Sequence, residues 1–366
     1  MRLRELRIRD LRAIVAADLV LHPRLNAFVG PNGAGKTSAL EAMHLLSYGR
    51  SFRRGPRQHL IRRTAGALSV YAELERDQGG IDRLGLMIPA TGGELELHVN
   101  GSVEERLGEL LRHCAVCCHE PGSHELIAGP AELRRAYLDW SLFHVEPAFW
   151  ATWRRYQRAL QQRNALLRQG GALSELQPWD RELIQQGVKI ANWRTAFVRG
   201  ALEPALARNL SGLVPELGAS QVILDPGWSG AETEEGYAQA LAARLSRDRE
   251  RRQTGAGPHR ADWRMRFELA PVREQLSRGQ EKQAALACTL AQVEVLHRQT
   301  GECPILCLDD LPSELDLAHG RQALELLLAS GAQAMITGTH FDPELDELMR
   351  DGSVFHVERG AFRSAN

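Results

Sequence analysis

The chain has 366 residues, of which 43% are hydrophobic and 25% are charged. This composition excludes a disordered chain and is typical of a soluble globular protein with two or three domains. The net charge of −1, from 45 basic and 46 acidic residues, argues against a strongly basic DNA-coating protein. The basic residues exceed the acidic ones in 1–80 and 131–260, so a basic face on a neutral protein remains possible.

The sequence has no features of a membrane or secreted protein. It contains no apolar run of about 18 residues, the length that spans a bilayer. The segment Met1–Glu5 lacks an apolar signal core. Six cysteines are too few for a disulfide scaffold of this length. We therefore expect a cytoplasmic protein with reduced thiols.

The predicted elements change in character along the chain. Apolar runs predict strands within 1–29, at 68–74 and at 95–99, with one helix at 38–47. Good helix formers dominate 131–211, and we expect Gly170-Gly171 and Pro178 to interrupt the helices there. Further elements are expected as strands at 221–225, 304–308 and 334–337, and as helices at 231–252, 280–298 and 318–330. This order predicts one α/β domain that is split by a helical insertion.

A phosphate-binding loop follows the third strand. The segment Gly30-Pro31-Asn32-Gly33-Ala34-Gly35-Lys36-Thr37 fits the pattern G-x-x-x-x-G-K-[ST], and Ser38 follows it. Glycines let backbone N–H groups face phosphate oxygens, the lysine adds a positive charge, and the threonine hydroxyl can hold Mg²⁺. The helix that follows adds its positive dipole end. We therefore expect residues 30–38 to bind ATP, with Thr37 as a metal ligand.

A second acidic element ends a buried strand. The run Ile305–Leu308 is followed by Asp309, which is expected to hold Mg²⁺ through a water molecule, as a Walker-B acid does. Asp310 comes next and is placed to orient an attacking water. Two aspartates at this place also suit a plain helix N-cap.

A second helix start is expected to bind phosphate. Ser277-Arg278-Gly279-Gln280 follows Leu276 and opens a helix, where exposed N–H groups can bind an anion. The alternative is an ordinary capped helix.

Taken together, the ordered set of motifs resembles ABC-type ATPase heads of the SMC-like class, with Ser313-Glu314-Leu315-Asp316 in the place of the D-loop. More closely, it resembles the RecF family of bacterial recombination-repair proteins. The stretches that carry this likeness are 49–53 (GRSFR), 134–140 (RRAYLDW), 162–165 (QRNA) and 257–262 (GPHRAD).

The resemblance implies a fold and an activity. The fold is α/β: an ABC/SMC-type P-loop ATPase head from 1–115 and 262–366, with a mainly helical inserted domain at 116–261. The activity is that of a weak DNA-dependent ATPase with ATP and Mg²⁺. Such a protein dimerises on ATP, with Ser277 and Gly279 contacting the γ-phosphate held by the other subunit. It binds duplex DNA near single-strand gaps and works with RecR and RecO to load RecA.

Four positions differ from the family pattern or leave two interpretations open. The segment 115–120 lacks the glutamine of a Q-loop. Asp310 stands where transporter cassettes have glutamate, and its shorter arm suggests slow hydrolysis. His340 follows a predicted strand and is either a γ-phosphate sensor or a surface histidine. Arg12 lies where related heads place a basic residue near the phosphates, although Ala13 replaces the asparagine usual in the family.

Two other groups of residues have more than one interpretation. Cys114 and Cys117 have the spacing of half a zinc site, but no second pair lies at a suitable distance, which favours buried thiols. Arginines gather in two clusters that favour phosphate contacts on DNA over a solvated face, without a choice of individual contacts. They are Arg50, Arg53, Arg54, Arg57, Arg62 and Arg63 in the first, and Arg154, Arg155, Arg158, Arg163 and Arg168 in the second.

The resemblance thus implies an ATP-driven DNA clamp, a dimer that forms on ATP and binds duplex DNA. Three other functions compete with it. A transporter cassette would need a membrane partner, a Q-loop and a catalytic glutamate. A structural SMC protein would need long heptad segments between the two halves of the head. A nucleotide-bound interaction module with negligible turnover would use the same motifs.

Overall fold

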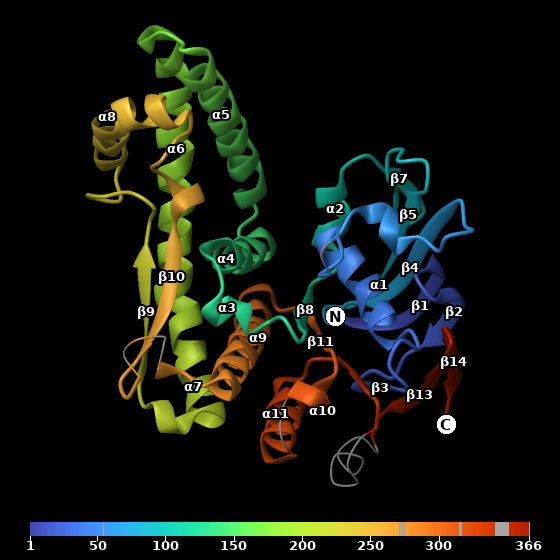
Figure 1. Cartoon of the computed structure of the whole chain (residues 1–366). Helices are drawn as coiled ribbons and strands as arrows, with labels where there is room; N and C mark the ends of the chain where they lie inside the picture. Colours follow the sequence, from blue (N-terminus) through green and yellow to red (C-terminus); the bar gives the residue numbers. More distant parts are fainter. Residues whose placement is uncertain (54, 271, 273–274, 315–316, 341–350, 366) are drawn as a thin grey trace. The chain divides into compact units, whose positions relative to one another are not determined.

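The computed structural model divides into two compact units, Met1–Ser123 with Arg278–Asn366, and His124–Ser277 (Figure 1). It describes residues 1–53, 55–270, 272, 275–314, 317–340 and 351–365. The N-terminal and C-terminal parts of the chain, blue and red in Figure 1, form the same unit. The helical part is therefore an insertion, as the order of elements indicated.

Both unit boundaries lie later in the chain than the expected ones at 115/116 and 261/262. The strand β8 (Val116–His119) pairs with the head strand β11 (Ile305–Leu308), so the head continues past residue 115. The strand β10 (Asp262–Phe267) pairs with β9 (Ser220–Asp225), so the insertion continues past residue 261. Strand pairing sets the boundaries in both cases.

The first unit contains an antiparallel sheet in the order β2-β1-β4-β5-β6-β7. Its strands are β1 (Arg2–Leu11), β2 (Ile14–Val20), β4 (Ala67–Glu75), β5 (Ile81–Pro89), β6 (Glu96–Val99) and β7 (Ser102–Glu104). In β4 every second side chain is buried, which is the pattern of a sheet with one face on the core.

A second sheet of this unit has the order β14-β13-β3-β12-β11-β8. Its remaining strands are β3 (Leu25–Val29), β12 (Ala334–Gly338), β13 (Ser353–Glu358) and β14 (Ala361–Ser364). The neighbours from β13 to β8 run parallel, and every residue of β11 and β12 is buried. Continuous burial is expected for parallel strands that are covered on both faces.

The helices of the first unit connect and cover these sheets. They are α1 (Lys36–Tyr48), α2 (Leu107–Arg112), α9 (Arg278–Thr300), α10 (Leu311–Glu314) and α11 (Leu317–Ser330), with the short 3₁₀ helix η1 (Arg57–Leu60). The helix α1 contacts β1 of the antiparallel sheet and β8 and β12 of the parallel sheet. Its side chains are buried on nearly all sides, as expected for a helix enclosed between two sheets.

The second unit is mainly helical. Its helices are α3 (Glu125–Ala128), α4 (Ala131–Val145), α5 (Phe149–Gln169), α6 (Leu173–Phe197), α7 (Glu203–Leu213) and α8 (Glu234–Arg251). Short turns of other helix types occur at η2 (Val198–Leu202), η3 (Pro215–Leu217) and η4 (Pro258–Arg260). Among the described residues, no helix has both the length and the apolar character needed to cross a bilayer.

The expectation that Pro178 interrupts a helix is wrong. The helices α5 and α6 separate at Gly170, whose left-handed φ of 75° ends α5, whereas Pro178 lies inside α6. Proline removes one hydrogen bond to the carbonyl four residues earlier, here that of Ser174. Both residues are exposed near the start of α6, so water can satisfy that carbonyl.

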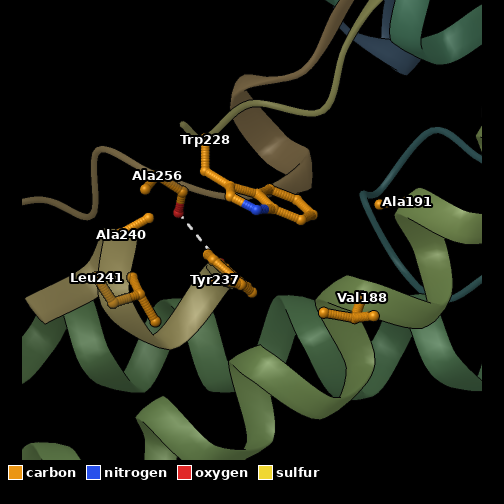
Figure 2. Packing of buried hydrophobic residues seen from close by; sticks show 7 residues of the cluster. All are labelled: Val188, Ala191, Trp228, Tyr237, Ala240, Leu241 and Ala256. Carbon is orange, nitrogen blue, oxygen red and sulfur yellow. Dashed lines mark hydrogen bonds between the residues drawn. The ribbon is translucent and has the colours of Figure 1, made fainter. Parts of the chain in front are cut away.

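Aromatic side chains anchor a small core in the second unit (Figure 2). The rings of Trp228 and Tyr237 stack with their centroids 4.6 Å apart. The Tyr237 hydroxyl donates to the Ala256 carbonyl at 3.1 Å. Gly257 follows with a φ of 130°, and a Cβ there would lie 2.1 Å from Tyr237 Oη and 2.5 Å from Tyr156 Oη. Only glycine fits this turn.

We expect Gly257→Ala to destabilise the protein by about 2–4 kcal/mol, because it adds overpacking to an unfavourable φ. Urea unfolding followed by tryptophan fluorescence measures this change. Gly200→Ala is the control, because a Cβ at Gly200 would meet no atom within 4 Å. Because Gly200 is exposed within a helical segment, this substitution should not destabilise the protein and should stabilise it by up to about 1 kcal/mol. Equal stability of the two variants would contradict the packing described.

Candidate functional site

The carboxyl ends of four parallel strands meet at one edge of the sheet. Val29 of β3 is in register with Gly338 of β12, and Leu308 of β11 with His119 of β8. Beyond the strands, the Asp309 N–H donates to the His119 carbonyl at 2.8 Å. The Gly30 N–H donates to the Gly338 carbonyl at 3.3 Å. Ligands of α/β sheets bind at this edge, and the phosphate loop and the two acids after β11 lie at it.

The loop between β3 and α1 has the geometry that its glycines predict. A Cβ on Gly30 would lie 2.1 Å from the Val357 carbonyl oxygen, which excludes any side chain there. Gly33 and Gly35 have φ values of 78° and 115°, in the region that favours glycine. The helix α1 begins at Lys36, so its first N–H groups face the loop.

The Lys36 ammonium is buried, and only 6% of the residue is exposed. It donates to the carbonyls of Gly30 at 2.7 Å and Pro31 at 3.0 Å, which lie at the start of the loop. Burial lowers the pKa of Lys36, while the nearby carboxylates of Asp310 and Asp309 act in the opposite direction. The lysine charge is therefore placed inside the loop, beside two acids.

Asp309 is held by two hydroxyl groups. Thr37 of α1 donates to Asp309 Oδ1 at 2.9 Å, and Thr337 of β12 donates to the same oxygen at 2.7 Å. The Thr337 oxygen in turn accepts the N–H of Asp310 at 2.8 Å. Asp310 has a left-handed φ of 54°, which is uncommon for a residue other than glycine. Thr337 thus fixes the side chain of Asp309 and the backbone of Asp310.

The oxygen atoms of Thr37 and Asp309 suit a magnesium ion. They lie 2.9 Å apart, and a hydroxyl with a carboxylate is the protein contribution that Mg²⁺ uses beside phosphates and water. Burial raises the pKa of Asp309, while the hydroxyls of Thr337 and Thr37 and the charge of Arg53 lower it. A buried carboxylate that is costly to ionise gains most from a cation.

Arg12 lies in the turn between β1 and β2 with a left-handed φ of 52°. Its guanidinium binds Glu41 of α1 through two hydrogen bonds, Nε to Oε2 at 2.6 Å and Nη2 to Oε1 at 2.7 Å. Glu41 is fully buried. A partner for Arg12 on α1 was not foreseen from the sequence.

The other expected site residues lie in several places. Ser38 is buried in the first turn of α1, and His340 is exposed just after β12. Arg278, Gly279 and Gln280 form the first turn of α9, with Ser277 exposed directly before it.

The end of β8 and the described residues of the expected D-loop lie close to Asp309 and Asp310. Of the D-loop, Leu315 and Asp316 lie outside the described residues, and the Ser313 N–H donates to the Asp310 carbonyl at 2.9 Å. At the place of the missing Q-loop glutamine, Glu120 follows β8 and accepts the Gly122 N–H at 2.9 Å. Glu120, Glu41 and Thr337 were missed in the sequence because no motif marks them.

The cysteines do not form a metal site within the described part of the chain. Cys114 and Cys117 are buried, and burial raises the pKa of Cys114 to about 12. Among the described residues, no group of three or more His, Cys, Asp or Glu side chains could hold a metal ion. The expectation that Cys114 and Cys117 are buried thiols is confirmed.

The arginines of the second cluster, within 154–168, differ in their exposure to solvent. Arg163 is buried and donates to Asp180 at 2.6 Å and to Asp248 at 2.8 Å, so its inclusion in a DNA-binding face is wrong. It points inward because α5 is amphipathic and turns that position to the core. Arg154, Arg158 and Arg168 are exposed on α5.

Known proteins share this architecture. The chain matches the family model of the RecF/RecN/SMC N terminal domain over residues 2–361. It is 43% identical over 360 residues to the DNA replication and repair protein RecF of Stenotrophomonas maltophilia (strain R551-3), with 98% of each chain covered. The chain belongs to the RecF family. The resemblance seen in the sequence is thereby confirmed.

Relatives and solved structures extend this result. The RecF protein of Edwardsiella ictaluri (strain 93-146) is 36% identical, with 98% of this chain and 99% of that one covered. A structure of the recombination mediator protein RecF-ATP in the RecFOR pathway has a TM-score of 0.89 at 26% identity, covering 100% of this chain and 98% of that one. An SmcHead bound to the C-winged helix domain of ScpA, at 14% identity, covers 100% and 97% with a TM-score of 0.60, which shows a common fold. The expected ABC/SMC-type head is confirmed.

We expect Thr337→Val to destabilise the protein by about 1–3 kcal/mol, because it leaves the Asp310 N–H without its acceptor and removes a donor to Asp309. Urea unfolding measures this effect. Thr337→Ser is the matched control, since it keeps the hydroxyl and loses only a methyl group. If the valine variant is as stable as the serine variant, the hydroxyl does not have the role described.

Proposed function

We propose that the chain is an ATP-dependent DNA-binding clamp that acts in bacterial DNA replication and recombinational repair. One observation carries this proposal: Lys36, Thr37 and Asp309 lie together at one edge of the parallel sheet. The chain that holds them matches RecF proteins over nearly its whole length. The RecF-ATP structure at a TM-score of 0.89 supports ATP as the nucleotide. Relatives named for DNA replication and repair support DNA as the second ligand.

The phosphate loop, residues 30–37, and Ser38 would bind the ATP phosphates, with Lys36 close to the β- and γ-phosphates. The Lys36 ammonium would exchange its bonds to the Gly30 and Pro31 carbonyls for bonds to phosphate oxygens. Thr37 and Asp309 would hold Mg²⁺. That ion neutralises charge on the transferred phosphoryl group when it is bound.

Asp310 is proposed to orient the water that attacks the γ-phosphate, after which the bond to the β-phosphate breaks and ADP and phosphate form. Its backbone is fixed by Thr337, which places the carboxylate beyond the strand end. An aspartate reaches less far than a glutamate, and this supports slow turnover. His340, exposed after the neighbouring strand, is proposed to sense the γ-phosphate.

Dimerisation is proposed to complete the site. Ser277, Arg278, Gly279 and Gln280 would contact the γ-phosphate bound by the other subunit, so that ATP joins two heads. The dimer would enclose duplex DNA near a single-strand gap, with exposed arginines as phosphate contacts. Hydrolysis of ATP would remove the γ-phosphate that joins the two heads, and the dimer would open. RecR and RecO would be its partners in loading RecA, and the cytoplasm its location.

We expect Ser277→Arg to abolish ATP-dependent dimerisation while leaving ATP binding to the single subunit intact. Ser277 is exposed, so the larger side chain has room at the surface of the subunit. The molar mass in solution, measured by light scattering with and without ATP–Mg²⁺, tests this. The wild type should double in mass with ATP.

Lys36→Met is the companion variant, which should lose both ATP binding and dimerisation. An ATP-dependent dimer that persists in Ser277→Arg would contradict the assignment of the second phosphate-binding helix start. A wild type that stays monomeric with ATP and does not bind DNA would leave only a nucleotide-binding module.

A further inference from the structure

The small sheet of the second unit has two edges of different character. Among the described strands, β10 pairs only with β9 (Figure 1). On the outer edge of β9, the Val222 N–H donates to Glu203 Oε1 at 2.8 Å, and the Val222 carbonyl accepts Arg199 Nη1 at 2.9 Å. Charged side chains therefore satisfy the backbone of this edge, which is one way in which proteins protect the edge of a sheet.

The same bonds show which backbone groups of β10 face the opposite edge. In an antiparallel pair, residues alternate between those bonded to the partner strand and those whose N–H and C=O point away from it. Val222 points away from β10 and is in register with Met265, so the N–H and C=O of Met265 point away from β9. The Glu268 N–H, three residues later, bonds to the Ala219 carbonyl at 2.9 Å, which agrees with this alternation. Neither backbone group of Met265 has a partner among the described residues.

A groove of about 550 Å³ lies along this part of β10. Its lining includes Met265 from one face of the strand and Arg264 from the other, so the groove reaches the edge between the two faces. Leu126 and Ile127 of α3 form an apolar wall beside it. All the lining residues belong to the second unit. A strand edge with unpaired backbone groups beside an apolar groove is the form of site that takes an extended peptide as an additional strand.

Arg134 joins the walls of the groove. Its Nε and Nη2 bind the two oxygens of Asp262 in β10, at 2.7 and 3.2 Å. Its Nη1 donates to the carbonyls of Gly129 at 2.8 Å and Leu126 at 3.3 Å on the opposite wall. The Trp263 Nε1 donates to the Arg134 carbonyl at 2.8 Å. Because these bonds form within the folded unit, the groove is ordered before any ligand binds, which favours binding.

The charges of the groove are mainly positive. Its described lining contains the arginines Arg134, Arg264 and Arg266 and one acid, Asp262. Asp262 already binds Arg134 and also accepts a bond from Arg264 Nε at 2.8 Å. Arg264 and Arg266 are exposed and, two residues apart in a strand, lie on the same face of β10. The complementary ligand carries acidic side chains on that face.

A second copy of this chain and DNA both fit the groove less well. Antiparallel pairing of two β10 edges around Met265 would place Arg264 of one copy opposite Arg266 of the other, and like charges directly opposite each other are destabilising. Duplex DNA would meet the arginines with its phosphates but would leave the apolar wall of Leu126 and Ile127 without a contact.

We propose that the open edge of β10 is a docking site for an extended, acidic segment of a partner protein, which adds to β9 and β10 as a third strand. Successive side chains of a strand point to opposite faces. The acidic side chains of the segment lie beside Arg264 and Arg266, and the apolar side chains between them lie on the face of Met265. The site is separate from the phosphate loop and does not need nucleotide.

The test uses a capped, fluorescently labelled peptide of about eight residues, a strand-forming length, in which valine and glutamate alternate. Fluorescence anisotropy measures its binding to the full chain without nucleotide. We expect it to bind at least about tenfold more tightly than the same peptide with lysine in place of glutamate.

Two N-methylated forms of this peptide test the strand pairing itself. One carries methyl groups on the valine amides and the other on the glutamate amides. Only one edge of an added strand faces β10, so one form should lose at least about tenfold in affinity and the other should bind within about twofold of the parent peptide.

Met265→Pro removes the N–H at the open edge. It keeps the bonds to β9, because that N–H points away from β9, and proline is tolerated at such an edge position. The variant should lose at least about tenfold in affinity for the glutamate peptide. Met265→Leu, which keeps the N–H and the volume, is the matched control and should bind within about twofold. Circular dichroism checks that both variants are folded.

The double variant of Arg264→Glu and Arg266→Glu keeps the test informative if Met265→Pro does not fold. It should reverse the preference, so that the lysine peptide binds more tightly than the glutamate peptide.

Three results would overturn the inference. The first is equal binding of the glutamate peptide to wild type, Met265→Pro and the double variant, or of both methylated forms to wild type. The second is a dimer of the wild type without nucleotide that Met265→Pro abolishes, since the edge would then belong to a second copy. The third is loss of duplex DNA binding in the double variant when wild type shows no preference between the peptides. None of these results changes the expected binding of ATP at the phosphate loop.

Discussion

The need to bury the Asp309 carboxylate at the end of the buried strand β11 organises this site. A carboxylate there is costly to desolvate, and the fold offsets the cost with hydroxyl donors from two other elements, Thr37 of α1 and Thr337 of β12. These bonds tie the phosphate loop, the acid-bearing strand and the neighbouring strand to one oxygen atom. A cation that enters with the nucleotide would bind this oxygen in place of a hydroxyl donor, so the same atoms would serve stability and function.

This arrangement also explains why the chain is split. The phosphate loop comes from residues before 40 and the acids from residues after 300, so the parallel sheet forms only when both ends of the chain meet. The insertion His124–Ser277 builds its own core around Tyr237 and Trp228 and ends directly before α9. The last residue of the insertion is thus Ser277, the residue proposed to contact a second subunit.

The sequence predicts those parts of the site whose chemistry requires a fixed spacing. The phosphate loop and Asp309 could be identified because glycines, a lysine and a strand-ending acid have few other reasons to occur in that order. Glu41 and Thr337 could not, because a glutamate in a helix or a threonine in a strand is common and gains its role only from contacts with residues far along the chain. The burial of Arg163 and the continuation of α6 through Pro178 likewise depend on packing and solvent exposure.

The most direct test of the account is an experimental structure of the chain with an ATP analogue and Mg²⁺. The account predicts that Lys36 Nζ leaves the Gly30 and Pro31 carbonyls for phosphate oxygens, and that Mg²⁺ lies between Thr37 and Asp309. It also predicts that Ser277 of a second subunit faces the γ-phosphate. A nucleotide bound away from this sheet edge, or a metal ion without either oxygen ligand, would contradict it.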